Sequence, residues 1–127
     1  MPDVTVKRVE DFEAIFGGGF RRARAGLGVS SFGLAVIDLP PNFSHYPEHD
    51  QTHDDQEEVY TVINDSGRVK LDDEVIEIRQ WDVIRVAPNV ARGFEAGPDG
   101  LEIIAAGGSK PEGGDGSLVE DHWSGDK

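Results

Sequence analysis

The sequence predicts one small all-β domain, either a sandwich or a barrel, and three observations lead to this fold class. The chain has 127 residues, a length that suits a single domain with one hydrophobic core. From residue 20 onward, short apolar runs are separated by turn residues at intervals of about 8–12 residues, the spacing typical of sandwiches and barrels. Several runs alternate apolar and polar residues, as strands do when only one face is buried.

The N-terminal residues are predicted to hold an edge strand and a short helix. Residues 1–8 alternate around Val4 and Val6, which indicates a short strand. Residues 9–16 place four apolar side chains on one helical face: Val9, Phe12, Ile15 and Phe16. The glycines at 17–19 follow, and glycine tolerates the backbone geometry that ends a helix. We therefore expect one helix of two turns at most.

Seven further segments are predicted to be strands, because each is an apolar run that ends in turn residues. They are 31–39, 57–63, 68–71, 75–78, 82–86, 92–95 and 101–106. The expected turns between them include Asn64–Gly67, Asp72–Glu74 and Gly97–Gly100. Residues 108–127 are rich in Gly and Asp and predict a loosely held tail, so the expected barrel spans residues 1–107.

The composition limits the classes of partner. Acidic residues outnumber basic residues by 25 to 12, for a formal charge of -13, so nucleic acid is not an expected partner. The basic cluster in the sequence is Arg21, Arg22 and Arg24. No run of about 18 apolar residues predicts a membrane span, and the first residues lack the layout of a secretory signal. We expect a cytoplasmic protein, and without cysteine it has no thiolate ligand for a metal.

Two segments, His49–Gly67 and Trp81–Phe94, resemble the two sequence motifs of the cupin superfamily. The first family motif is His-x-His followed by Glu and then Gly, and the second is a Pro turn followed closely by His. The hairpin at 72–74 lies between them in the family's order. The resemblance covers roughly residues 30–107, and it implies a double-stranded β-helix, the cupin jelly-roll barrel.

The resemblance implies four metal-ligand positions, which fall here on His49, Gln51, Glu58 and Arg92. Gln51 offers a neutral amide oxygen, a weak ligand that suits hard cations better than zinc or iron. Arg92 cannot ligate and places a positive charge where the metal would bind. That charge costs several kcal/mol against a dication even at a moderate dielectric constant. We therefore expect no tightly bound transition metal, and a divalent metal would need His49, Gln51, His53 and Glu58.

Two arrangements of Arg92 remain open. It either forms an ion pair with Glu58 in place of the metal, or it receives an anionic group of a small ligand that Glu58 and His49 orient. Period two in a strand places Tyr60 on the face of Glu58, and Phe94 on the face of Arg92. The predicted ligand-binding residues are His49, Gln51, Glu58, Tyr60, Arg92 and Phe94.

The resulting prediction is a small-molecule-binding or vestigial cupin of uncertain activity, with an unknown cofactor and, by resemblance, a homodimeric state. One alternative is a metal-dependent dioxygenase or isomerase that uses His49, Glu58 and either Gln51 or His53. Another is a metal-free isomerase or lyase, with His49 or Glu58 as general base and Arg92 as the stabiliser of an oxyanion. A structural or sensory partner domain with a filled pocket is the third class.

Overall fold

The computed structural model describes residues 2–15, 19–44, 46–51 and 56–108, and the fold is given for these residues. The elements in chain order are η1 (Val9–Asp11), β1 (Ala14–Ile15), β2 (Phe20–Arg21), α1 (Ala23–Leu27), β3 (Gly33–Leu39), β4 (Glu57–Leu71), β5 (Glu74–Arg79), β6 (Val83–Val86) and β7 (Arg92–Gly108). The described residues are therefore mostly β-strand with one short α-helix, as the predicted fold class requires.

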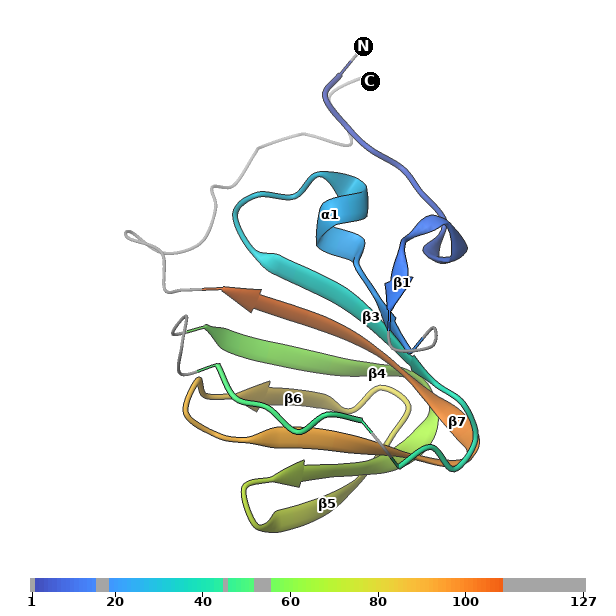
Figure 1. Cartoon of the computed structure of the whole chain (residues 1–127), viewed down its shortest axis with the longest axis vertical. Coiled ribbons are helices and arrows are strands. Elements are labelled where there is room, and N and C mark those ends of the chain that lie inside the picture. The colour runs from blue at the N-terminus through green and yellow to red at the C-terminus, as the bar shows by residue number, and fades with distance from the viewer. Residues whose placement is uncertain (1, 16–18, 45, 52–55, 109–127) are drawn as a thin grey trace, which may run out of the picture.

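The strands form an antiparallel sheet in the order β1-β2-β3-β7-β4-β5, and β6 pairs with β4. The two long strands, β4 and β7, pair with each other along most of their length. On its other side β4 pairs with β6 through residues 58–61 and with β5 through residues 66–71. A strand that changes partners in this way contributes to both layers of the barrel. Figure 1 shows these strands side by side, with α1 lying next to β3.

Residues 64–67 and 97–100 do not reverse the chain, which corrects two of the predicted turns. Both segments lie inside continuous strands, β4 and β7. The β4–β7 register shifts between Val62 and Asn64 and again between Asp65 and Gly67, and Asp65 has a positive φ of 65°. These residues have the composition of a turn, but the pairing of β4 with β7 before and after them continues both strands, so the sequence signal produces β-bulges instead.

The main core fills the barrel with side chains from the inner faces of β3, β4 and β7. The bulges change which positions face inward, from even numbers before them to odd numbers after them in both long strands. The largest fully buried apolar side chains are Tyr60, Ile37, Leu101, Ile103, Val62 and Val69. A second small cluster of Phe12, Ala23 and Val36 packs α1 against the outer face of β3.

The short helix lies at Ala23–Leu27 and not at residues 9–16, where the apolar periodicity predicted it. Residues 9–11 form one 3-10 turn, and Phe12 is buried while Val9 is 43% exposed. Alanine, arginine and leucine favour helix at 23–27, and Gly28 ends it with φ 77°. The predicted strand at residues 1–8 is also wrong, because the described residues 2–8 belong to no strand.

Candidate functional site

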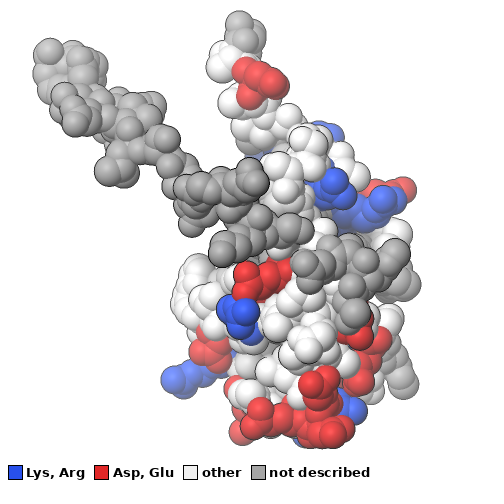
Figure 2. All heavy atoms as spheres, turned by 90° about the vertical axis from the view of Figure 1, so that its left-hand side faces the viewer, with Lys and Arg blue, Asp and Glu red and all other residues white. Residues whose placement is uncertain are grey.

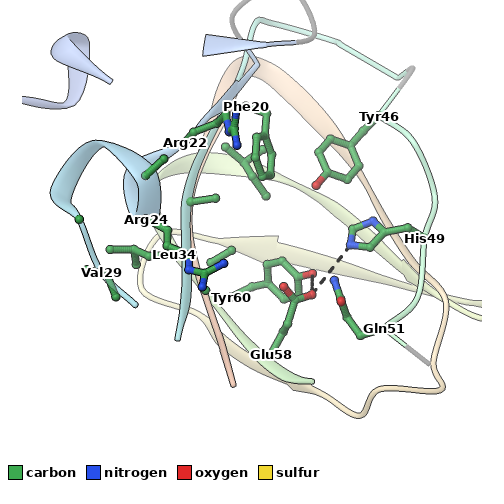
Figure 3. Close-up of a pocket in the computed structure, with 16 residues that line it drawn as sticks. Phe20, Arg22, Arg24, Val29, Leu34, Tyr46, His49, Gln51, Glu58 and Tyr60 are labelled. Atoms are coloured by element: carbon green, nitrogen blue, oxygen red, sulfur yellow. Dashed lines mark hydrogen bonds and ion pairs between the residues drawn. The ribbon is translucent and has the colours of Figure 1, made fainter. Parts of the chain in front are cut away.

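A cavity of about 520 Å³ opens at one end of the barrel. Its walls are formed by residues of β3 and β4, by segment 46–51, and by residues 20–29, which include the end of β2 and part of α1. Figure 3 shows Arg22, Arg24 and Val29 on one side of it and Tyr46, His49 and Gln51 on the other, with Glu58 and Tyr60 between them.

Four of the predicted site residues line this cavity: His49, Gln51, Glu58 and Tyr60. Glu58 and Tyr60 are alternate residues of β4, so both point to its inner face as period two predicts. His49 is held by two backbone hydrogen bonds with Arg92, of 3.0 Å and 2.7 Å. The backbone N–H of Gln51 donates to the Pro88 carbonyl at 2.7 Å. Segment 46–51 is therefore fixed against the start of β7.

The other two predicted residues, Arg92 and Phe94, lie behind the cavity wall and do not line it. Arg92 is fully buried, and its Nε lies 3.6 Å from Oε1 of Glu58. Of the two arrangements considered for Arg92, the structure shows the ion pair with Glu58. Phe94 is buried as well, and its ring packs edge-on against Tyr60 and Tyr46, with centroids 4.9 Å and 5.5 Å apart. Phe94 therefore supports two residues of the cavity wall from behind.

Arg92 makes few other contacts through its guanidinium group. Nη2 donates to the Ala87 carbonyl at 3.2 Å. Nε and Nη1 are buried and have no hydrogen-bond partner among the described residues. The charge of Arg92 is therefore directed at Glu58 and at the turn after β6.

The carboxylate of Glu58 receives several polar contacts on one oxygen. The Tyr60 hydroxyl donates to Oε1, and Nε2 of His49 lies 3.9 Å from it. Burial raises the pKa of Glu58, but His49, Tyr60 and the charge of Arg92 together lower it below its usual range. Burial and the bond to the carboxylate raise the pKa of Tyr60, so its hydroxyl keeps its proton. The site therefore presents an ionised carboxylate with a neutral phenol beside it.

The residues at the four family positions do not fit a transition metal. Among the described residues, no group of three or more His, Asp or Glu side chains could hold one. The Arg92 guanidinium is fully buried, so its positive charge cannot move into solvent when a cation binds. His53, the fifth residue considered as a ligand, lies outside the described residues, and its role stays a prediction.

Sequence reasoning missed three polar residues of the cavity: Tyr46, Arg22 and Arg24. Burial, followed by the charge of Glu58, raises the pKa of Tyr46 to about 12. Tyr46 is three residues before His49, and this proximity was a usable signal. The two arginines were recognised as a basic cluster, but nothing in the sequence placed them at the barrel mouth. The pairing of β2 with Val36 and Ile37 of β3 brings them there.

Structural comparison identifies the class of fold. A cupin protein from Bacteroides fragilis is similar over 94% of this chain and 93% of its own, with a TM-score of 0.70 and 19% identity. An uncharacterised protein with a double-stranded β-helix domain from Klebsiella pneumoniae gives a TM-score of 0.65 at 17% identity, over 91% of this chain and 96% of its own. KdgF from Halomonas sp. gives 0.64 at 13% identity, over 88% of this chain and 98% of its own.

The chain therefore has the cupin fold, a double-stranded β-helix, which confirms the predicted fold class. No protein-family model matches the sequence, and no curated protein matches it. In the described part of the chain, no helix has both the length and the apolar character that a membrane crossing requires.

Proposed function

We propose that this cupin-fold protein binds a small organic molecule in the cavity at the barrel mouth, without a tightly held transition metal. The observation that carries the proposal is the cavity itself, of about 520 Å³, within the range of about 300–1,000 Å³ typical of ligand sites. It combines an apolar wall with a few polar groups on two facing sides, an arrangement that can orient a bound small molecule.

The Arg92–Glu58 pair supports a binding role that needs no metal. A guanidinium 3.6 Å from the carboxylate supplies the positive charge that a metal would otherwise bring to this position. Glu58 remains an acceptor toward the cavity, because a carboxylate accepts about four hydrogen bonds. His49 and Gln51 stand beside it on segment 46–51 and add further polar contacts for a ligand.

The same geometry favours binding over catalysis. General acid–base catalysis works best when the pKa of the group is near the operating pH, and the pKa of Glu58 is lowered instead. The metal-free isomerase or lyase requires Arg92 to touch a developing oxyanion, and Arg92 does not line the cavity. The metal-dependent enzyme requires ligands that the described residues do not supply. The homodimer and the cytoplasmic location stay predictions.

A cavity-blocking substitution tests the proposal. Ala25 lines the cavity and is exposed, so Ala25→Trp fills the mouth with little effect on folding. Ala14→Trp adds the same ring at an exposed position of β1 outside the cavity. A panel of small carboxylates, sugars and neutral aromatics is screened by thermal shift and by NMR titration of all three proteins.

We expect at least one compound to bind wild type and Ala14→Trp alike and to bind Ala25→Trp at least about tenfold more weakly, a loss of about 1.4 kcal/mol. Compounds that bind all three proteins equally would place the binding elsewhere. The absence of any binder across the panel would favour the vestigial class. Elemental analysis of the same samples checks for a stoichiometric transition metal.

A further inference from the structure

We infer that the ligand is an amphipathic organic acid whose anionic group binds Arg24 and whose far end donates a hydrogen bond to Glu58. The inference rests on the proposed function and adds a chemical class and an orientation to it. It also assigns the anion to a residue of α1, since Arg92, the arginine expected to receive an anion, lies behind the cavity wall.

Arg24 is the arginine of the cavity wall whose charge lacks a partner in the described part of the chain. Its Nη2 donates to the Ser30 carbonyl at 3.3 Å, and no carboxylate of a described residue lies within ion-pair distance of it. Arg22, by contrast, already pairs with Glu13 at 3.0 Å, and both of those side chains are more than half exposed. A guanidinium forms strong, charge-assisted hydrogen bonds with a carboxylate or a phosphate.

The backbone holds Arg24 in a fixed position. The Arg24 carbonyl accepts hydrogen bonds from the N–H groups of Gly28 and Val29, each at 3.0 Å. These bonds close the end of α1 around Gly28, which has a left-handed φ of 77°. Next to Arg24, Ala23 is 1% exposed and anchors α1 on β3. The side chain therefore starts from a rigid base, and this lowers the entropy cost of binding.

The cavity between Arg24 and Glu58 is largely apolar. Phe20, Leu34 and Ile37 are among the residues that line it, and Figure 3 shows Arg24 on the α1 side of the cavity and Glu58 on β4. A ligand that reaches both ends needs an apolar middle. The end at Glu58 is a neutral donor such as a hydroxyl group, because Arg92 already balances the carboxylate charge. A second anionic end would be repelled there.

The negative charge of the whole protein opposes the binding of an organic anion. With a formal charge of -13, the protein repels anions at long range. Figure 2 shows acidic side chains gathered at the end of the molecule away from the N-terminal segment. Saturable binding of an organic anion therefore requires a local cation.

Three probes separate the two ends of the ligand: para-hydroxyhydrocinnamate, hydrocinnamate, which lacks the hydroxyl donor, and para-hydroxyphenylpropanol, which lacks the charge. Dissociation constants are measured by NMR titration with wild type, Arg24→Gln, Arg22→Gln and Arg79→Gln. Arg79 is an exposed arginine of β5 outside this cavity, so Arg79→Gln controls for the change in net charge.

For wild type we expect the hydroxy acid to bind tightest of the three. Arg24→Gln should weaken both acids by at least about tenfold and the neutral alcohol by less than about twofold. Arg22→Gln should cost less than about threefold, because Glu13 already pairs with Arg22. Arg79→Gln should leave every constant within about twofold of wild type.

Two results would overturn the inference and leave the proposed function standing. One is an affinity of Arg24→Gln for the two acids that equals that of wild type, or a greater loss of that affinity in Arg22→Gln than in Arg24→Gln. The other is binding of only neutral compounds in the cavity, with sensitivity to Ala25→Trp. Failure of every compound to respond to Ala25→Trp would instead remove the proposed function itself.

Discussion

Replacement of Arg92 by methionine removes the buried cation beside Glu58 and keeps a long side chain in its place. The two charged groups are 3.6 Å apart, Arg92 is fully buried, and the Glu58 side chain is 14% exposed. At an effective dielectric constant of about 20, their attraction is roughly 5 kcal/mol. Part of that attraction offsets the cost of burying the guanidinium. The variant is left with a carboxylate that keeps its contacts with His49 and Tyr60 and has lost the guanidinium charge.

Protonation of Glu58 limits the cost of the substitution. The carboxyl group has an ordinary pKa of 4.5, so it can be kept neutral at a higher pH only at a cost of about 1.4 kcal/mol for each pH unit above that value. We therefore expect Arg92→Met to lower the free energy of unfolding by about 3 kcal/mol near pH 7 and by less than about 1 kcal/mol near pH 5.

The sign of this pH dependence follows from the two pKa shifts of Glu58. In wild type the pKa is lowered on folding, so the stabilisation is present above the unfolded pKa and is lost as the pH falls through the folded pKa. In the variant the pKa is raised on folding, so stability is lost as the pH rises from the unfolded pKa toward the folded one. The difference between the two proteins therefore widens from acid to neutral pH.

Urea denaturation at both pH values measures these differences. The double variant Arg92→Met/Glu58→Gln carries neither charge, and we expect it to recover most of the stability that Arg92→Met loses near neutral pH. Its deficit should not grow with pH as that of Arg92→Met does. An Arg92→Met protein as stable as wild type at both pH values, with an unchanged m-value, would refute the energetic coupling of Arg92 to Glu58.

Two further substitutions test the site and its framework. Arg92→His removes the positive charge and adds an imidazole near His49 and Glu58. We therefore expect it to bind Zn²⁺ at least about tenfold more tightly than wild type in a chelator competition assay. Equal affinity of the two proteins would contradict the claim that the charge of Arg92 opposes metal binding. Gly26→Ala places a Cβ atom 2.4 Å from the Phe12 ring, and we expect a loss of about 1–3 kcal/mol in urea denaturation. An unchanged midpoint would show that the packing of α1 does not depend on this close approach.

The strands from residue 33 onward were predictable from the sequence because their period of two reflects burial on one face. That signal is direct in β4, where Tyr60 and Val62 are buried and Val59 is exposed. The turn predicted at residues 64–67 was wrong, because turn-forming residues also occur in β-bulges. Only the pairing of β4 with β7 distinguishes a bulge from a turn at this position. The helical periodicity of residues 9–16 is misleading for a different reason, because among the described residues 9–15 packing on β3 buries only Phe12.

The candidate site was predictable where its chemistry is local. The family resemblance placed Arg92 near Glu58 and left two arrangements open, and the structure shows the ion pair. The placement of Arg24 depends on tertiary structure, because α1 reaches the cavity only after β2 has paired with the middle of β3. Sequence spacing contains no information about that approach, so the cationic side of the cavity was not predicted.

The position of β7 in the sheet constrains how the chain can fold during synthesis. β7 is the last described strand along the chain, yet it lies between β3 and β4 and pairs with both. A nascent chain that ends before residue 92 has both of these strands without their shared partner, and their apolar inner faces stay exposed to solvent. Pairing partners so distant in sequence fold slowly, and such intermediates aggregate readily. The sheet can therefore be completed only after residues 92–108 have left the ribosome.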